Sequence, residues 1–205
     1  FKHINYDKLI KISSSHLMLP SLYVKLKKNG YIKNIPKDLA KYLKQIYLLN
    51  LERNKSLIKE INEISKILLS NNIRHVFIKG ASLTLETYED IGERMVGDID
   101  ILTSVDDFLK AVDSLKLNGY KSKTDVYFFD QKHYPRLINK NKLFAVEIHN
   151  RAFSKNKTIN IEYSNLKKNK ILNTNNIQTP NYMDQHLINI YNDQINDNGF
   201  IKDNY

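Results

Sequence analysis

Three acidic side chains on two short apolar segments are the residues of this chain best suited to chemistry. Asp98 and Asp100 lie two residues apart in the segment 98–102, and Glu147 lies in the segment 144–150. Both segments alternate apolar and polar residues as half-buried strands do, so each strand directs its acids to one face. Carboxylates that share a face repel each other unless a proton or a cation relieves the repulsion, and a divalent ion with oxygen ligands is the usual relief. Glu147 would complete a metal site of three carboxylates.

A turn at the end of another apolar run suggests a place for a phosphate. Val76-Phe-Ile78 runs into Lys79-Gly-Ala-Ser82 and then into 83–88, which is typical of a strand, a tight turn and a helix. The first N–H groups of a helix lack partners within it and favour an anion. A phosphate beside paired carboxylates indicates metal-assisted chemistry at phosphorus. Each motif also has a purely structural interpretation, as a strand end for the two aspartates and as an ordinary helix start for the turn.

The order of these motifs resembles a known enzyme family. Four segments carry the likeness: Ile78-Lys-Gly-Ala-Ser-Leu, Glu93-Arg-Met-Val-Gly-Asp-Ile-Asp-Ile-Leu, Leu117-Asn-Gly-Tyr and Val146-Glu-Ile-His. They are similar to motifs of a largely uncharacterised bacterial nucleotidyltransferase family within the polymerase-beta-like nucleotidyltransferase superfamily. The gap between the turn and the aspartates is longer than in the compact superfamily pattern, so Arg94 is expected on an extra loop beside the site.

The resemblance implies an enzyme that transfers a nucleoside monophosphate from a nucleoside triphosphate, such as ATP, to an acceptor hydroxyl. Mg²⁺, with Mn²⁺ as an alternative, would be held by Asp98, Asp100 and Glu147, and Glu147 could instead be the general base. The acceptor would be RNA (a tRNA end, for example), a protein or a small molecule. The residues expected to bind the nucleotide are Lys79, Gly80, Ala81, Ser82, Arg94 and His149.

Two histidines and a rival function leave alternatives open. His149 shares a face with Glu147 and could orient that carboxylate, bind a phosphate or simply form part of the wall of the site. His133 lies where the family often has a histidine, and a structural role is its alternative. The rival to an enzyme is a non-catalytic module that binds nucleotide or RNA within a toxin–antitoxin or biosynthetic complex. A hydrolase that uses the same metals is a third option.

Composition restricts the class of protein and its partners. The 205 residues include no cysteine, which excludes a disulfide framework and a thiolate metal site. No apolar run approaches the ~20 residues that span a bilayer, so we expect no membrane partner and a cytoplasmic protein by default. The net charge of +10 fits a nucleotide or RNA partner. The chain is also rich in lysine, asparagine and isoleucine together, which is typical of proteins from AT-rich genomes and would explain the charge equally well. Nothing in the sequence indicates an oligomeric state.

We expect an α/β (α+β) fold with a polymerase-beta-like nucleotidyltransferase core and a mixed sheet at residues 73–153. An N-terminal helical region, 1–72, would pack on the core, and a C-terminal helical extension, 154–205, would follow as the start of a longer region. Apolar spacing and turn residues place the elements. The expected helices are two within 5–29, one long helix or two in line over 36–71, and others at 105–117, 159–166 and 183–195; the expected strands are 76–78, 98–102, 120–129, 134–138 and 143–150, with an extended piece at 171–178.

Overall fold

The computed structural model describes residues 4–128, 131–153, 161–166, 168–170 and 177–192. The chain forms two compact units, one made of residues 1–58 with 87–96 and the other of residues 59–86 with 97–205. The domain boundaries expected after residues 72 and 153 stay predictions.

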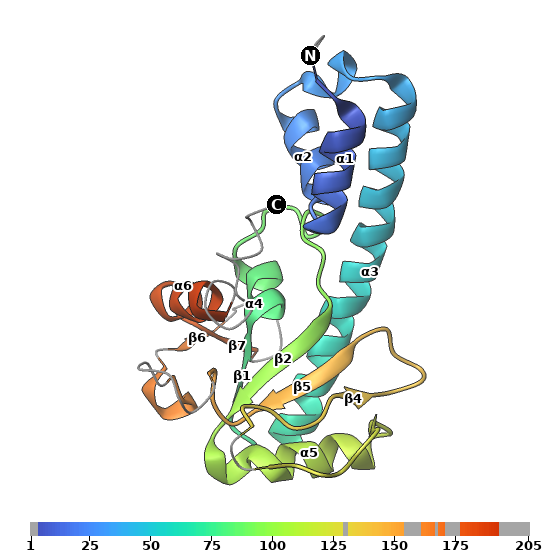
Figure 1. The fold of residues 1–205 in the computed structure, drawn as a ribbon. Coiled ribbons are helices and arrows are strands. Elements are labelled where there is room, and N and C mark those ends of the chain that lie inside the picture. The colour runs from blue at the N-terminus through green and yellow to red at the C-terminus, as the bar shows by residue number, and fades with distance from the viewer. Residues whose placement is uncertain (1–3, 129–130, 154–160, 167, 171–176, 193–205) are drawn as a thin grey trace. The chain divides into compact units, whose positions relative to one another are not determined.

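The first unit is helical, as the sequence indicated. Its helices are α1 (Tyr6–Ser15), α2 (Leu19–Lys28) and the first part of α3 (Lys37–Ser70), with a 3₁₀ turn at Tyr31–Asn34 (Figure 1). Pro20 lies in the first turn of α2, where its missing N–H breaks no hydrogen bond. The apolar side chains that these helices bury together are Leu19, Tyr23, Ile35 and Leu43.

Helix α3 is one continuous helix of 34 residues. The sequence predicted one long helix or two in line over residues 36–71, and the structure has the single helix. It buries leucine and isoleucine at helical spacing and ends where Asn72 takes a left-handed backbone conformation with φ of 56°. The buried side of the helix is not purely apolar, because it also carries polar residues with little exposure: Asn50, Asn54, Glu60 and Ser65.

The second unit contains a five-stranded mixed sheet in the order β1-β2-β5-β4-β3 (Figure 1). Strand β2 pairs in parallel with β5, and all other neighbours are antiparallel. This confirms the mixed sheet predicted within residues 73–153. The strands are β1 (His75–Ile78), β2 (Asp98–Thr103), β3 (Lys121–Ser122), β4 (Leu137–Ile138) and β5 (Ala145–His149).

Strands β3 and β4 are much shorter than the sequence predicted. The strand expected over 120–129 stops at Ser122, and residues 129–130 lie outside the described part. Val126 and Phe128 alternate as a buried strand face would, yet both side chains are more than half exposed. Period-two alternation predicts a strand only where a neighbouring strand pairs with it.

Helices α4 (Lys79–Glu86) and α5 (Phe108–Leu117) belong to the second unit. A 3₁₀ turn at Val105–Asp107 precedes α5, and the Ser104 side chain caps it by accepting a hydrogen bond from the Asp107 N–H. Gly119, with φ of 88°, follows α5 and ends the helix in a left-handed conformation. In the described residues, no helix combines the length and the apolar character that crossing a membrane requires.

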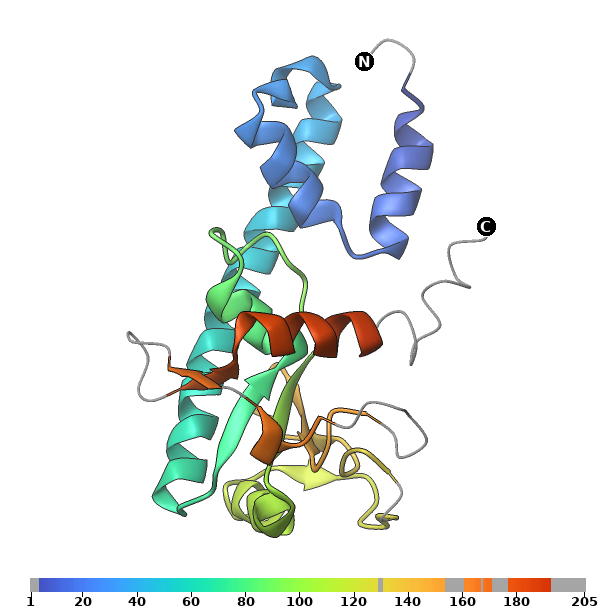
Figure 2. The same ribbon diagram turned by 90° about the vertical axis from the view of Figure 1, so that its left-hand side faces the viewer.

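The last described elements lie against the start of the core. Strands β6 (Lys168–Lys170) and β7 (Gln178–Pro180) pair with each other, β7 contacts β1, and helix α6 (Tyr182–Ile190) contacts α4 (Figures 1 and 2). The described part of the helix predicted at 159–166 contains only a 3₁₀ turn, Tyr163–Asn165. Most of the extended piece at 171–178 lies outside the described residues. The helix predicted at 183–195 corresponds to α6, except for its last residues, which also lie outside.

Candidate active site

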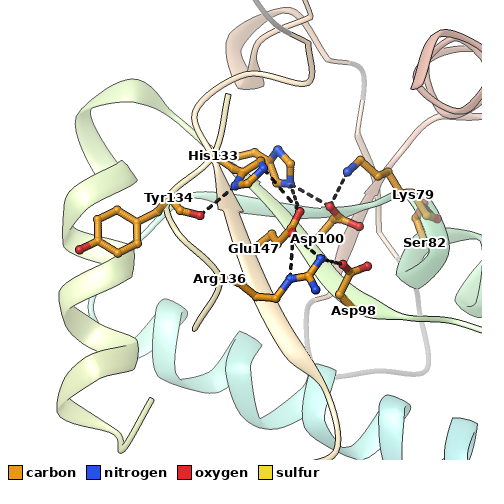
Figure 3. Close-up of polar contacts among 9 residues, drawn as sticks. Lys79, Ser82, Asp98, Asp100, His133, Tyr134, Arg136 and Glu147 are labelled. Atoms are coloured by element: carbon orange, nitrogen blue, oxygen red, sulfur yellow. Dashed lines mark hydrogen bonds and ion pairs between the residues drawn. The ribbon is translucent and has the colours of Figure 1, made fainter. Parts of the chain in front are cut away.

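Asp100 and Glu147 lie side by side on the parallel strands β2 and β5. The register pairs Asp100 with Glu147 and Asp98 with Ala145. Because successive side chains of a strand point to opposite faces, Asp98, Asp100 and Glu147 share one face. The intervening Ile99 lies on the opposite face and is fully buried. Figure 3 shows the three carboxylates close together, so the structure brings together the three acids that the sequence singled out.

Two cationic side chains pair with these carboxylates. The Lys79 Nζ lies 2.5 Å from the Asp100 Oδ1. Arg136 donates from Nε and Nη2 to the Glu147 Oε1, at 3.1 and 2.9 Å, and its Nη2 also lies 3.0 Å from the Asp98 Oδ2 (Figure 3). The three acids therefore carry one more negative charge than their two cationic partners neutralise.

His149 is completely buried beside the acids. Its Nε2 lies 2.8 Å from the Asp100 Oδ1 and 3.6 Å from the Glu147 Oε2. Its Nδ1 is buried and has no hydrogen-bond partner among the residues that the structure describes. An ionised carboxylate only accepts hydrogen bonds, so the Nε2 must carry the proton and donate a hydrogen bond to Asp100. His149 thus orients Asp100, whereas the carboxylate that the sequence interpretation expected it to orient was Glu147.

The environment separates the acidities of the three carboxyl groups. Burial would raise the pKa of Asp100, but His149 and Lys79 donate to its carboxylate and lower the pKa below its usual value. Burial likewise opposes the ionisation of Glu147, whose pKa is nevertheless lowered by His149, His133 and Arg136. The pKa of Asp98 is raised by burial and by the negative charges of the other two acids. Asp98 is therefore the member of the group that most needs a further cation.

Lys79 stands at the junction of β1 and α4 in a strained backbone conformation. Its φ of 54° is in the left-handed region, which residues with a Cβ rarely adopt. The sequence predicted a tight turn between the strand and the helix. The helix instead begins at Lys79 itself, directly after β1. Such strain persists only where the surroundings enforce it. Here the conformation accompanies a side chain that ends at Asp100.

The remaining residues of the predicted phosphate turn form the first turn of α4. Gly80 is partly exposed, whereas Ala81 and Ser82 are fully buried. The Ser82 hydroxyl donates a hydrogen bond to the Lys79 carbonyl at 3.0 Å, three residues back in the helix, whereas a capping side chain would accept one from a backbone N–H. The backbone N–H groups of this turn have the orientation that favours an anion. That these three residues bind a triphosphate stays a prediction.

Arg94 lies on the loop 87–96 of the first unit. Its carbonyl accepts hydrogen bonds from the Nδ2 atoms of Asn50 and Asn54, at 2.9 and 2.7 Å. Two residues earlier, the Gly92 carbonyl accepts a further bond from Asn50 at 2.8 Å. Helix α3 therefore holds the backbone of this loop. A role for the Arg94 side chain in nucleotide binding stays a prediction.

The sequence interpretation missed Arg136 and underestimated His133. Arg136 lies just before β4, and only the pairing of β4 with β5 brings it to Glu147. The one signal in the sequence is that arginine is rare here, with five in the chain. His133 forms an isolated bridge with His149, and its Nε2 lies 3.9 Å from the Glu147 Oε2. Both side chains therefore belong to the environment of the carboxylates.

The residues present fit a divalent cation. Ligand atoms of Asp100, Glu147 and His149 lie within 4.8 Å of one another, and the carboxylates exceed the cations beside them. His149 is the least suitable of these three as a ligand. If its Nε2 bound a metal, the proton would move to Nδ1, a buried atom without an acceptor among the described residues. Carboxylate oxygens are thus the better ligands, and Asp98 on the same face extends the set.

Comparison with known proteins agrees with this geometry. None of the curated proteins matches the sequence. Among solved structures, the chain is similar to a Thermotoga maritima protein described as a candidate nucleotidyltransferase, with a TM-score of 0.53 and 15% identity over 72% of this chain and 91% of that one. At this identity the likeness shows the fold, which confirms the expected nucleotidyltransferase architecture. The model of the uncharacterised nucleotidyltransferase family matches residues 2–191, so the chain belongs to this nucleotidyltransferase family.

Proposed function

We propose that this nucleotidyltransferase transfers a nucleoside monophosphate from a nucleoside triphosphate, ATP among the candidates, to an acceptor hydroxyl in a reaction that requires Mg²⁺ or Mn²⁺. The observation that carries the proposal is the placement of Asp100 opposite Glu147 in the parallel register of β2 and β5, with Asp98 on the same face. Family membership favours this enzyme over a non-catalytic binding module.

In this proposal the acids hold the metal. Asp98, Asp100 and Glu147 would hold the divalent cation, which would neutralise triphosphate charge and lower the pKa of the attacking hydroxyl. His149 keeps the Asp100 carboxylate oriented through its Nε2–H. Glu147 keeps its second expected role as general base only as the alternative to metal binding, because the lowered pKa of its carboxyl group makes the carboxylate a weak base.

The nucleotide would meet the protein at the start of α4. Backbone N–H groups of Gly80, Ala81 and Ser82 would bind the β- and γ-phosphates, and the ammonium group of Lys79 would neutralise phosphate charge. Arg94 is the second basic residue that we propose for the phosphates. With the β- and γ-phosphates held, the acceptor oxygen would bond to the α-phosphorus as its hydroxyl proton passes to Glu147 or to water. The bond from the α-phosphorus to the α,β-bridging oxygen would break, and pyrophosphate would leave.

The acceptor is proposed from charge alone. A net charge of +10 attracts polyanions, which favours an RNA acceptor such as a tRNA end over a protein or a small molecule.

In the experiment, the protein is incubated with α-labelled nucleoside triphosphates, each in turn, with Mg²⁺ and the RNA, protein and small-molecule fractions of a bacterial lysate. Label in one fraction identifies the acceptor class.

The test compares the wild type with Asp98→Asn/Asp100→Asn. We expect the variant to lose transfer by orders of magnitude. The matched control is Asp106→Asn/Asp113→Asn, which removes the same two charges from exposed positions after β2 and should transfer normally. Transfer by the site variant at the wild-type rate would contradict the proposal, and free nucleotide without a labelled acceptor would indicate hydrolysis instead.

A further inference from the structure

We propose that Lys79 and Arg136 are internal counter-ions that compete with the divalent metal for the site carboxylates, so that metal and triphosphate strengthen each other's binding. The proposal rests on the proposed nucleotidyl transfer and adds an order to it. Metal alone would bind weakly, because the two cations already occupy carboxylate oxygens. The triphosphate would attract both cations and release those oxygens.

The contacts of Asp100 show how this competition arises. Its Oδ1 accepts hydrogen bonds from both the Lys79 Nζ, at 2.5 Å, and the His149 Nε2, at 2.8 Å. An sp² carboxylate oxygen has two lone pairs, so these two donors use the capacity of Oδ1. The Lys79 side chain is only 15% exposed and that of Asp100 is 5% exposed, which keeps the ion pair strong by limiting its contact with water.

Arg136 occupies Glu147 in the same manner. Its Nε and Nη2 both donate to the Glu147 Oε1, which again accounts for both lone pairs of one oxygen. The same Nη2 also contacts the Asp98 Oδ2, so one guanidinium group links two of the three acids. The Arg136 side chain is 56% exposed and could turn outward without disturbing the core.

The charges then explain why the triphosphate would change the balance. Two cations beside three carboxylates leave one negative charge, and a divalent ion would reverse that sign and be repelled by the lysine and the arginine. Phosphate oxygens are strong acceptors for both cations, and arginine binds them in a bidentate manner. Because binding linkage is reciprocal, a triphosphate that takes the cations must raise the affinity for metal.

The experiment measures two affinities of Arg136→Gln by calorimetry. Mn²⁺ is titrated into the protein without nucleotide, and a non-hydrolysable nucleoside triphosphate is titrated in EDTA. We expect Arg136→Gln to bind Mn²⁺ about tenfold more tightly than the wild type and the metal-free nucleotide about tenfold more weakly, within the usual range of coupling between sites. Effects of opposite sign separate a competing cation from general damage to the site.

Two further variants make the result specific. Arg74→Gln removes an arginine that is 59% exposed and bonded to Asp107, and it should leave both affinities unchanged. Arg136→Lys keeps the positive charge but loses the forked contacts of the guanidinium group, so both affinities should lie between those of Arg136→Gln and the wild type. If the wild type transfers nucleotides but Arg136→Gln binds Mn²⁺ no more tightly than the wild type does, the counter-ion proposal is overturned and the proposed function is not. A wild type that binds no Mn²⁺ even in the presence of the nucleoside triphosphate would contradict the proposed function as well.

Discussion

Replacing Lys79 by methionine should destabilise the protein strongly in metal-free buffer. The substitution keeps the length of the side chain and removes the charge 2.5 Å from the Asp100 Oδ1. Because Asp100 is nearly completely buried, the loss leaves a buried carboxylate without its closest cation, and breaking such pairs costs at least about 3 kcal/mol. We expect a cost near this lower end, since His149 still donates to the same oxygen.

A glycine at the same position separates charge from backbone strain. Lys79→Gly also removes the cation, but glycine adopts the φ of 54° without the steric penalty of about 1 kcal/mol that a Cβ brings. Lys79→Met keeps that penalty. Burial of the methionine side chain, worth about 1.5–3 kcal/mol, exceeds that penalty, so Lys79→Met should be the more stable of these two variants. The strain is measured instead against Lys79→Ala, which Lys79→Gly should exceed in stability by about 1 kcal/mol.

Divalent metal should restore the stability of Lys79→Met. A ligand at about 100 times its dissociation constant stabilises a folded protein by about 2.7 kcal/mol, which nearly offsets the loss. Urea unfolding in EDTA and in Mn²⁺ measures both terms. Mn²⁺ should raise the unfolding free energy of the variant more than that of the wild type. An equal increase in both proteins, or no increase in the variant, would refute the assignment of Lys79 as the counter-ion of a metal site.

Three other substitutions test separate parts of the account. His149→Gln keeps a donor near the position of Nε2 and should retain most transfer activity, whereas His149→Leu should lose about 10- to 100-fold in a transfer assay. His75 is buried, and burial lowers its pKa from the ordinary 6.5, so its contribution to the unfolding free energy is fully present above that pH and decreases as the pH falls below it. In His75→Gln, the unfolding free energy measured with urea should therefore fall less steeply between pH 7 and pH 5 than in the wild type. Tyr120→Phe removes the hydroxyl that donates to the buried Glu60 at 3.1 Å and should cost about 1–2 kcal/mol of unfolding free energy. Activity of His149→Leu equal to the wild type, an unchanged pH slope or a fully stable Tyr120→Phe would each contradict the corresponding contact.

Local pattern was sufficient to predict the elements that carry the acids. The alternation in β2 and β5 predicted strands that carry Asp98, Asp100 and Glu147 on one face, although nearly every residue of both strands is buried. The apolar stripe predicted one long helix or two in line, and the structure has the single helix α3. These features depend only on periods of two and 3.6 residues along the chain. The N-cap at Ser104 and the stop at Gly119 have equally local causes.

The partners of the acids depend on tertiary structure and could not be predicted in this way. Arg136 reaches Glu147 because β4 pairs with β5, and His149 reaches Asp100 because β2 and β5 are parallel. Asn54 would normally be assigned to the exposed side of a helix, yet it is fully buried and donates to backbone carbonyls of the loop 87–96. A polar residue in a helix gives no sign of such a distant acceptor.

The most direct test of the central claim uses one triphosphate labelled at two different positions. With Mg²⁺ and the acceptor fraction, the wild type should transfer label from the α-phosphate and none from the γ-phosphate, and Asp98→Asn/Asp100→Asn should transfer neither. This result would establish nucleotidyl transfer at the carboxylates of β2. Transfer of the γ-label, or α-label transfer that survives in the variant or in EDTA, would contradict the account.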